Sequence, residues 1–123
     1  MSVLDTTQGD LADLLGAALS CKAFPYIPER MIAPSVVVVP SSPWVISGNT
    51  YGKFVAAFDV EIVVQTAANS MKTKDLTDRV EEAIVTAVNE GYEVVQVEQP
   101  SALEANGAAY MSATIQIQTQ VSL

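Results

Sequence analysis

One stretch of the sequence, Lys53–Thr66, most narrows what this chain can fold into. Its side chains alternate in character with a period of two, and successive side chains of a β-strand point to opposite faces of a sheet. The stretch therefore predicts a long strand with one packed face and one wetter face. The packed face would carry Phe54, Ala56, Phe58, Val60, Ile62 and Val64, and the wetter face Val55, Ala57, Asp59, Glu61, Val63 and Gln65.

Several other segments are also typical of strands. Val36–Val39 is a short run of β-branched residues that predicts a buried strand, and Trp44–Ile46 predicts a short one within a turn-rich segment. Tyr92–Gln99 predicts a third main strand, followed by a loop over Pro100–Ala108. A fourth strand is expected over Ala109–Ser122, with an alternating inward face of Met111, Ala113, Ile115, Ile117 and Val121.

Two segments have the apolar spacing of amphipathic helices. Gln8–Ser20 places Leu11, Leu14, Leu15, Ala18 and Leu19 on one face, and Thr7 is a suitable N-cap. A second helix is expected from about Asp75 to Glu90, ended by Gly91. Its apolar stripe would consist of Leu76, Val80, Ala83, Ile84, Ala87 and Val88.

These elements predict an α+β fold in the order α-β-β-α-β-β. Between the first helix and the first main strand, Pro25, Pro28 and Pro34 predict an extended surface connector, because proline restricts both its own backbone and that of the preceding residue. We expect a two-layer sandwich with a mostly antiparallel sheet, four-stranded or slightly larger, and two helices on one face. The length of 123 residues suits a single domain, 1–123.

Charge excludes several classes of function. The chain has 14 acidic and six basic residues, for a net charge of −8, which disfavours binding to nucleic acid or to anionic membranes. All six bases lie at or before Arg79, and six acids follow it. Two long uncharged stretches, Met31–Gly52 and Ala105–Leu123, are too polar and too broken by proline to span a membrane as helices.

The residues available for chemistry are few. The sequence has no histidine, which excludes a Ser-His-Asp triad, a Cys-His dyad and a histidine-bearing zinc site. A single cysteine, Cys21, cannot form an internal disulfide and is expected to be a buried or incidental thiol. The glycines lack the spacing of a phosphate-binding loop, and the carboxylate pairs Glu81–Glu82 and Asp59–Glu61 are expected on solvated faces. We therefore predict no catalytic, cofactor-binding or metal-binding residues.

Bulky apolar residues in the expected loops leave two interpretations open. These side chains either cover the core or anchor a partner, since aromatic residues dominate interface hot spots. The two longest strands, each about 14 residues and roughly 45 Å, are at least as long as a compact domain of this size, so they bend or pair with a neighbour. The candidate interface comprises Tyr26, Ile27, Pro28, Glu29, Arg30, Trp44, Ile46 and Tyr51.

The order of elements resembles that of the tail terminator proteins of long-tailed phages with non-contractile tails, especially phages of actinobacterial hosts. The resemblance lies in a short leading helix, then PYIPERMIAPSVVVVP, PWVISGNTYG, the FVAAFDVEIVV strand, the AANSMK loop, the LTDRVEEAIVTAV helix and a final alternating strand. It covers nearly the whole chain and depends on pattern and size.

The resemblance implies a structural protein of the virion, assembled in the host cytoplasm. Such proteins form a hexameric ring that caps the head-proximal end of the tail tube, stops tube polymerisation and joins the tail to the head connector. The implied partners are further copies of the chain, the major tail tube protein and a head-to-tail connector or stopper protein. DNA would pass through without specific binding, and the resemblance implies neither catalysis nor a cofactor.

Other functions stay open at this point. The chain could be a different neck component, such as an adaptor or a stopper. It could instead be a small-molecule-binding regulatory domain on a ferredoxin-like sandwich, which would need a concave and partly apolar pocket with convergent polar groups. An enzyme would have to work with carboxylates, lysine or tyrosine alone.

Overall fold

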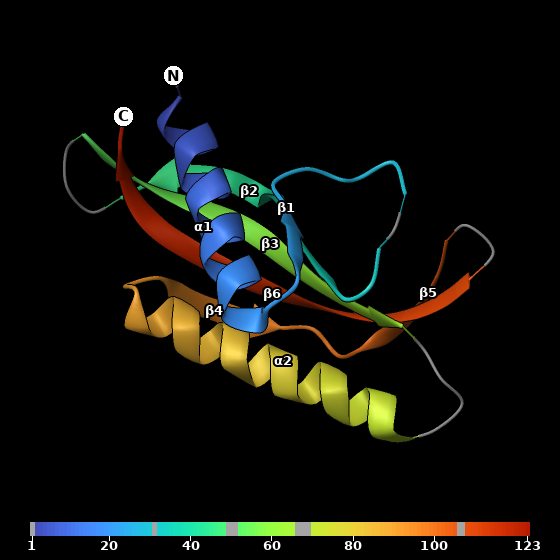
Figure 1. The fold of residues 1–123 in the computed structure, drawn as a ribbon. Coiled ribbons are helices and arrows are strands. Elements are labelled where there is room, and N and C mark those ends of the chain that lie inside the picture. The colour runs from blue at the N-terminus through green and yellow to red at the C-terminus, as the bar shows by residue number, and fades with distance from the viewer. Residues whose placement is uncertain (1, 31, 49–51, 66–69, 106–107) are drawn as a thin grey trace.

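The computed structural model describes residues 2–30, 32–48, 52–65, 70–105 and 108–123. Figure 1 shows two helices lying against one face of a curved sheet. The elements in chain order are α1 (Val3–Leu19), β1 (Lys22–Phe24), β2 (Ser35–Ser47), β3 (Lys53–Gln65), α2 (Ser70–Asn89), β4 (Glu93–Val97), β5 (Ser101–Ala105) and β6 (Ala108–Ser122). The predicted α+β class and the two-layer arrangement are confirmed.

The sheet is larger than its predicted core of four strands. Its six strands follow the order β1-β2-β3-β6-β4, and β5 pairs with β6 beyond β4. All pairs are antiparallel except β1 with β2, which makes the sheet mixed. The two strands expected to be longest, β3 and β6, pair with each other along the whole length of β3, from Lys53 opposite Ser122 to Gln65 opposite Tyr110.

Three details of the predicted strands were wrong. The connector contains the short strand β1, and the expected loop over Pro100–Ala108 contains β5 and the start of β6. The segments Val36–Val39 and Trp44–Ile46 are parts of one strand, β2, whose register shifts between Pro40 and Val45. Proline cannot donate to a ladder, so Pro40 and Pro43 look like strand breakers in sequence, whereas here a bulge accommodates them at a sheet edge.

The core lies between the helices and one face of the sheet. The predicted packed face of β3 is confirmed, since Ala56, Phe58, Val60, Ile62 and Val64 all belong to the buried cluster and Phe54 packs against it. The opposite face of the sheet, which we call the open face, is only partly wet. Asp59 and Glu61 are half-buried there, whereas Ala57 and Val63 are buried.

Helix α1 begins five residues earlier than predicted. Ser2 is the N-cap, and its side chain accepts a hydrogen bond from the Asp5 N–H at 3.3 Å. Thr7, the predicted cap, lies inside the helix, where its hydroxyl donates to the Val3 carbonyl at 2.8 Å. Both residues are good N-caps, and Gly9 does not prevent the helix from extending back to the earlier one.

A buried glutamine joins α1 to the edge of the sheet. Gln8 Nε2 donates to two carbonyl oxygens, those of Pro25 and Val38, each at 2.8 Å. These carbonyls lie immediately beyond the last β1–β2 pair, Phe24 with Val37. The amide therefore satisfies two backbone acceptors at the place where the parallel ladder stops, which an apolar side chain could not do.

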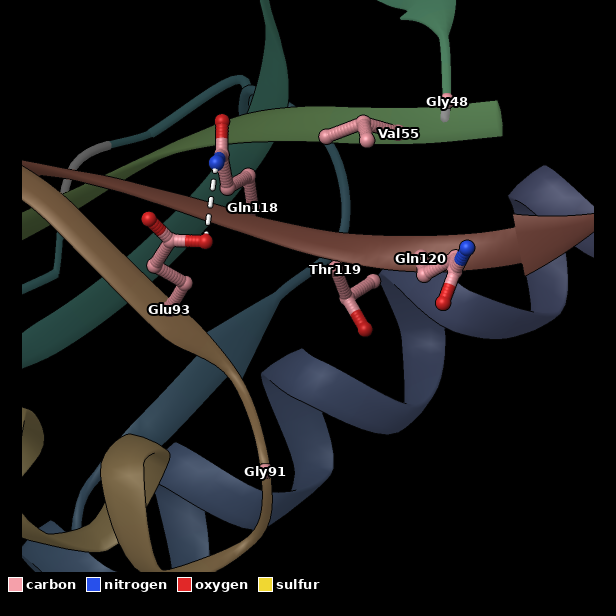
Figure 2. Close-up of a pocket in the computed structure, with 7 residues that line it drawn as sticks. All are labelled: Gly48, Val55, Gly91, Glu93, Gln118, Thr119 and Gln120. Atoms are coloured by element: carbon pink, nitrogen blue, oxygen red, sulfur yellow. Dashed lines mark hydrogen bonds between the residues drawn. The ribbon is translucent and has the colours of Figure 1, made fainter. Parts of the chain in front are cut away.

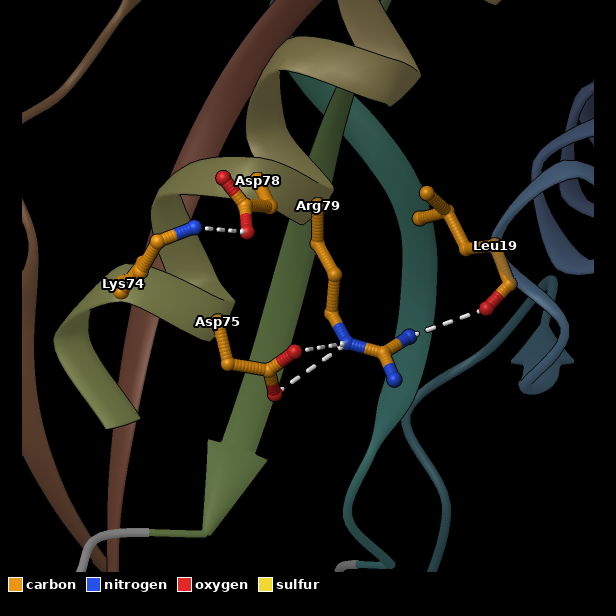
Figure 3. Close-up of polar contacts among 5 residues, drawn as sticks. All are labelled: Leu19, Lys74, Asp75, Asp78 and Arg79. Atoms are coloured by element: carbon orange, nitrogen blue, oxygen red, sulfur yellow. Dashed lines mark hydrogen bonds and ion pairs between the residues drawn. The ribbon is translucent and has the colours of Figure 1, made fainter. Parts of the chain in front are cut away.

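The two helices are also joined to each other at the C-terminus of α1 (Figure 3). Arg79 on α2 donates from Nη1 to the Leu19 carbonyl at 3.0 Å and from Nε to Asp75 at 3.3 Å. The last turn of α1 has no basic residue of its own, so Arg79 supplies the positive charge that the negative end of a helix dipole favours. A second pair, Lys74 with Asp78, is solvent-exposed and adds little.

Helix α2 ends as predicted at Gly91. The Gly91 N–H donates to the Val88 carbonyl at 3.1 Å and the Tyr92 N–H to the Ala87 carbonyl at 3.0 Å, with Gly91 at a φ of 90°. This is a Schellman motif, which needs a residue with positive φ. It turns the chain directly from α2 into β4.

The two glycines of α1 should respond oppositely to alanine. A Cβ on Gly9 would have no described atom within 4 Å, whereas a Cβ on Gly16 would lie 2.8 Å from the Cβ of Ala23 on β1. We expect Gly9→Ala to raise the free energy of unfolding by about 0.5–1 kcal/mol through helix propensity. Gly16→Ala should lower it by about 1–3 kcal/mol through overpacking. Urea denaturation measures both, and equal stabilisation by the two variants would contradict the close approach of α1 to β1.

Candidate functional site

At one outer edge of the sheet, the short strand β1 covers only part of β2. Strand β1 pairs with β2 at three positions, Lys22 with Ser35, Ala23 with Val36 and Phe24 with Val37. Beyond Val37, no strand of the described residues pairs with the outer side of β2. We call residues 22–30 together with 38–47 the β1–β2 edge.

The structure brings most of the predicted interface residues to the β1–β2 edge. Tyr26 is 58% exposed and Ile27 76%, and the Tyr26 ring meets Phe24 edge-on with centroids 5.7 Å apart. Trp44 is 41% exposed and Ile46 48%, both near the end of β2. Each of these four side chains therefore has apolar surface that a partner could contact.

The remaining predicted residues divide into two groups. Pro28 is half-buried, and Glu29 and Arg30 are exposed in the connector between β1 and β2. Tyr51 lies outside the described residues.

Tyr26 and Trp44 lie at different points along the edge, because Pro25 is level with Val38 and Trp44 is six residues further along β2. The candidate surface is therefore an extended strip.

The opposite edge of the sheet carries a second exposed apolar surface. Val85 and Val88 on α2 and Val95 and Val97 on β4 are each at least two-fifths exposed. Val97 also lines a groove of about 130 Å³ between α2 and the sheet, with Val80, Pro100 and two acids, Glu81 and Glu98. We call this surface, formed by residues 80–98, the α2–β4 edge.

The α2–β4 edge was not predicted from the sequence, for two reasons. Val88 has the helical spacing of the buried stripe and was predicted to belong to it, but it is 54% exposed because the sheet ends beneath that side of α2. In β4 the register shifts between Val94 and Gln96, so Val95 occupies a bulge. Two features of the sequence could have indicated this surface. Val85 is an apolar residue outside the apolar stripe of the second helix, and Val94, Val95 and Val97 do not alternate with polar residues as in a half-buried strand.

The open face ends in a polar hollow of about 310 Å³ (Figure 2). Its walls come from Gly48, Val55, Gly91, Glu93, Gln118, Thr119 and Gln120. Gln118 Nε2 donates to Glu93 Oε2 at 3.0 Å, so two of the polar groups are engaged with each other. Small-molecule sites are mostly apolar with a few polar groups, and this hollow has the reverse character.

The two carboxylate pairs singled out in the sequence lie on different elements of the fold. Glu81 and Glu82 are exposed on α2, as predicted, and Asp59 and Glu61 lie on the open face of β3. In the part of the chain that the structure describes, no group of three or more Cys, Asp or Glu residues is placed to hold a metal ion.

Cys21 lies just after α1 in a half-buried position. Burial raises the pKa of its thiol, and the nearby Arg79 guanidinium partly opposes that rise. Reactive cysteines have a lowered pKa, because the thiolate is the nucleophile. The environment of Cys21 therefore favours the neutral thiol.

Among the described residues, neither helix is both long enough and apolar enough to cross a membrane.

Comparison with known proteins assigns no family to the chain, because neither a family model nor a curated protein sequence matches it.

Alkaline pH should destabilise the fold through two groups. Burial raises the pKa of Cys21, and burial with the negative charges of Asp10 and Glu90 raises the pKa of Tyr92. A raised pKa means that the neutral form is favoured on folding, so this stabilisation is complete below the unfolded pKa values and is lost as pH rises through the folded ones. The urea midpoint should hold from about pH 7 to 8.5 and then fall above about pH 9. In the Cys21→Ala/Tyr92→Phe variant the decline should be shallower, and an identical decline would contradict the assignment.

Proposed function

We propose that this chain is a tail terminator protein of a long-tailed phage with a non-contractile tail. In this role copies of the chain form a ring at the head-proximal end of the tail tube, where they stop tube polymerisation and join the tail to the head connector. The proposal assigns no catalytic step and no cofactor to the chain. It begins from the resemblance in the order of elements and is supported by two properties of the fold.

The observation that carries the proposal is that one sheet leaves exposed apolar strips at both of its outer edges. A subunit of a ring needs two contact surfaces, one for each neighbour. The β1–β2 edge offers Tyr26, Ile27, Trp44 and Ile46, and the α2–β4 edge offers valines from both of its elements. Surfaces of this kind mark interaction sites when they are contiguous and rimmed by polar residues.

The middle of the open face has the charge that a DNA channel needs. On β3, the open-face positions from Lys53 to Gln65 include two acids, Asp59 and Glu61, in the middle of the strand and one base, Lys53, at its start. On β6 the facing positions include Thr114, Gln116 and Gln118, which are uncharged and polar. The two acids repel phosphates, and the Lys53 ammonium donates to the Ser122 hydroxyl on β6. A ring with the open face turned inward would let the genome pass.

A regulatory domain that binds a small molecule has less support. That function needs a concave site with a largely apolar lining, and the larger hollow is polar with one apolar side chain, Val55. The apolar groove beside α2 has a volume of only about 130 Å³. An adaptor or stopper belongs to the same structural class as a terminator and is separated from it by the experiment below.

The experiment is a tube-assembly assay with the major tail tube protein of the same phage. Polymerising tube protein is mixed with increasing amounts of this chain, and tube lengths are measured by electron microscopy. A terminator should shorten the tubes and add a ring of density at one end. An adaptor or stopper should leave tube length unchanged, which would contradict the proposal, as would light scattering that shows only unassociated monomer in the presence of tubes.

A further inference from the structure

The two exposed edges lie at opposite sides of the same sheet. The strand order runs from β1 through β2, β3 and β6 to β4, so β1 and β4 are its outermost strands. The central pair, β3 with β6, is continuous and holds the two edges at a fixed separation. A copy bound at one edge therefore leaves the other edge free to bind another copy, so that the same contact can repeat around a ring.

The two edges also have opposite charge. Two bases, Lys22 and Arg30, and one acid, Glu29, are exposed on the β1–β2 edge, which leaves this edge with one net positive charge. From Val80 to the last residue it has six acids and no base. Glu81 and Glu98 line the groove on the α2–β4 edge, and Glu93 lies on β4 itself. Like edges would repel one another, whereas unlike edges attract.

Both edges can bury apolar area in the same contact. The β1–β2 edge presents Trp44 and Ile46, and the α2–β4 edge presents Val85, Val88 and Val95 beside its groove. Pro40 and Pro43 lack N–H groups, so β2 cannot extend the sheet as one continuous ladder. Side chains must then make most of the contact, which guards against uncontrolled strand addition.

We infer that the β1–β2 edge of one copy binds the α2–β4 edge of the next, so that the two edges form one head-to-tail interface. Because each copy contributes a different surface, repetition of the contact gives a closed ring when the rotation closes. The occupant of each edge is thus a second copy of this chain. This inference rests on the proposed ring and specifies which surfaces build it.

Charge reversal provides the test. Glu81→Lys with Glu98→Lys replaces both acids of the groove by bases, so the groove and the β1–β2 edge are both basic. Lys22→Glu with Arg30→Glu makes both edges acidic. Each double variant alone should weaken self-association by about tenfold or more, because like charges then face each other. An equimolar mixture of the two should regain assembly as alternating rings, since the basic groove of one variant then meets the acidic β1–β2 edge of the other and the two unchanged edges meet each other. Sedimentation velocity over a concentration series measures this, with and without tubes of the tail tube protein.

The matched control is Asp5→Lys with Asp13→Lys, which changes the net charge as much as the groove variant does. Both residues are exposed on α1 and lie outside both edges. The control should assemble like the wild type.

The outcomes separate this inference from the proposed function. If both edge variants still form rings on tubes, as the wild type does, the pairing of the two edges is wrong and the proposed terminator function is unaffected. Variants that still self-associate but no longer bind tubes would assign the edges to the tube protein and overturn the inference. If the wild type forms no ring with tubes present, both proposals fail. Loss in each variant with recovery in the mixture supports the inference.

Discussion

The antiparallel pairing of β3 with β6 sets the position of every other element. It joins residues far apart in the sequence and places Phe58, Val60 and Ile62 beside Ile117, Ile115 and Ala113 in one buried layer. Both helices pack on that layer, and β2 and β4 extend the sheet on either side of it. Burial of such a layer removes a large apolar area from water and is the main favourable contribution to folding. The edges on which the proposals depend are held in place by this central pair.

Much of the fold could be predicted from periodicity alone. The alternation of Lys53–Thr66 and of Ala109–Ser122 gave the central strands, and the apolar spacing of two segments gave the helices. The errors arose where long-range contacts decide the structure. Strand β1 is only three residues long and forms because β2 lies alongside it and Gln8 satisfies the carbonyls where their pairing ends. The residues of β1 alone do not indicate its contact with β2 or with Gln8.

The candidate site was predicted in part. Bulky apolar side chains in segments expected to be loops indicated Tyr26, Ile27, Trp44 and Ile46 as interface candidates. All four are exposed. The second surface was missed because exposure of Val88 depends on where the sheet ends, and exposure of Val95 depends on a bulge. Charge asymmetry was visible in the sequence, but only the strand order shows that the acidic and basic segments lie at opposite edges.

Electron cryomicroscopy of the intact phage particle at side-chain detail tests the central claim most directly. The account predicts this chain as a ring at the head-proximal end of the tail tube, with β4 of each copy facing β2 of the next and Asp59 and Glu61 turned toward the DNA. Density for the chain at any other place in the particle, or its absence from the particle, would contradict the account.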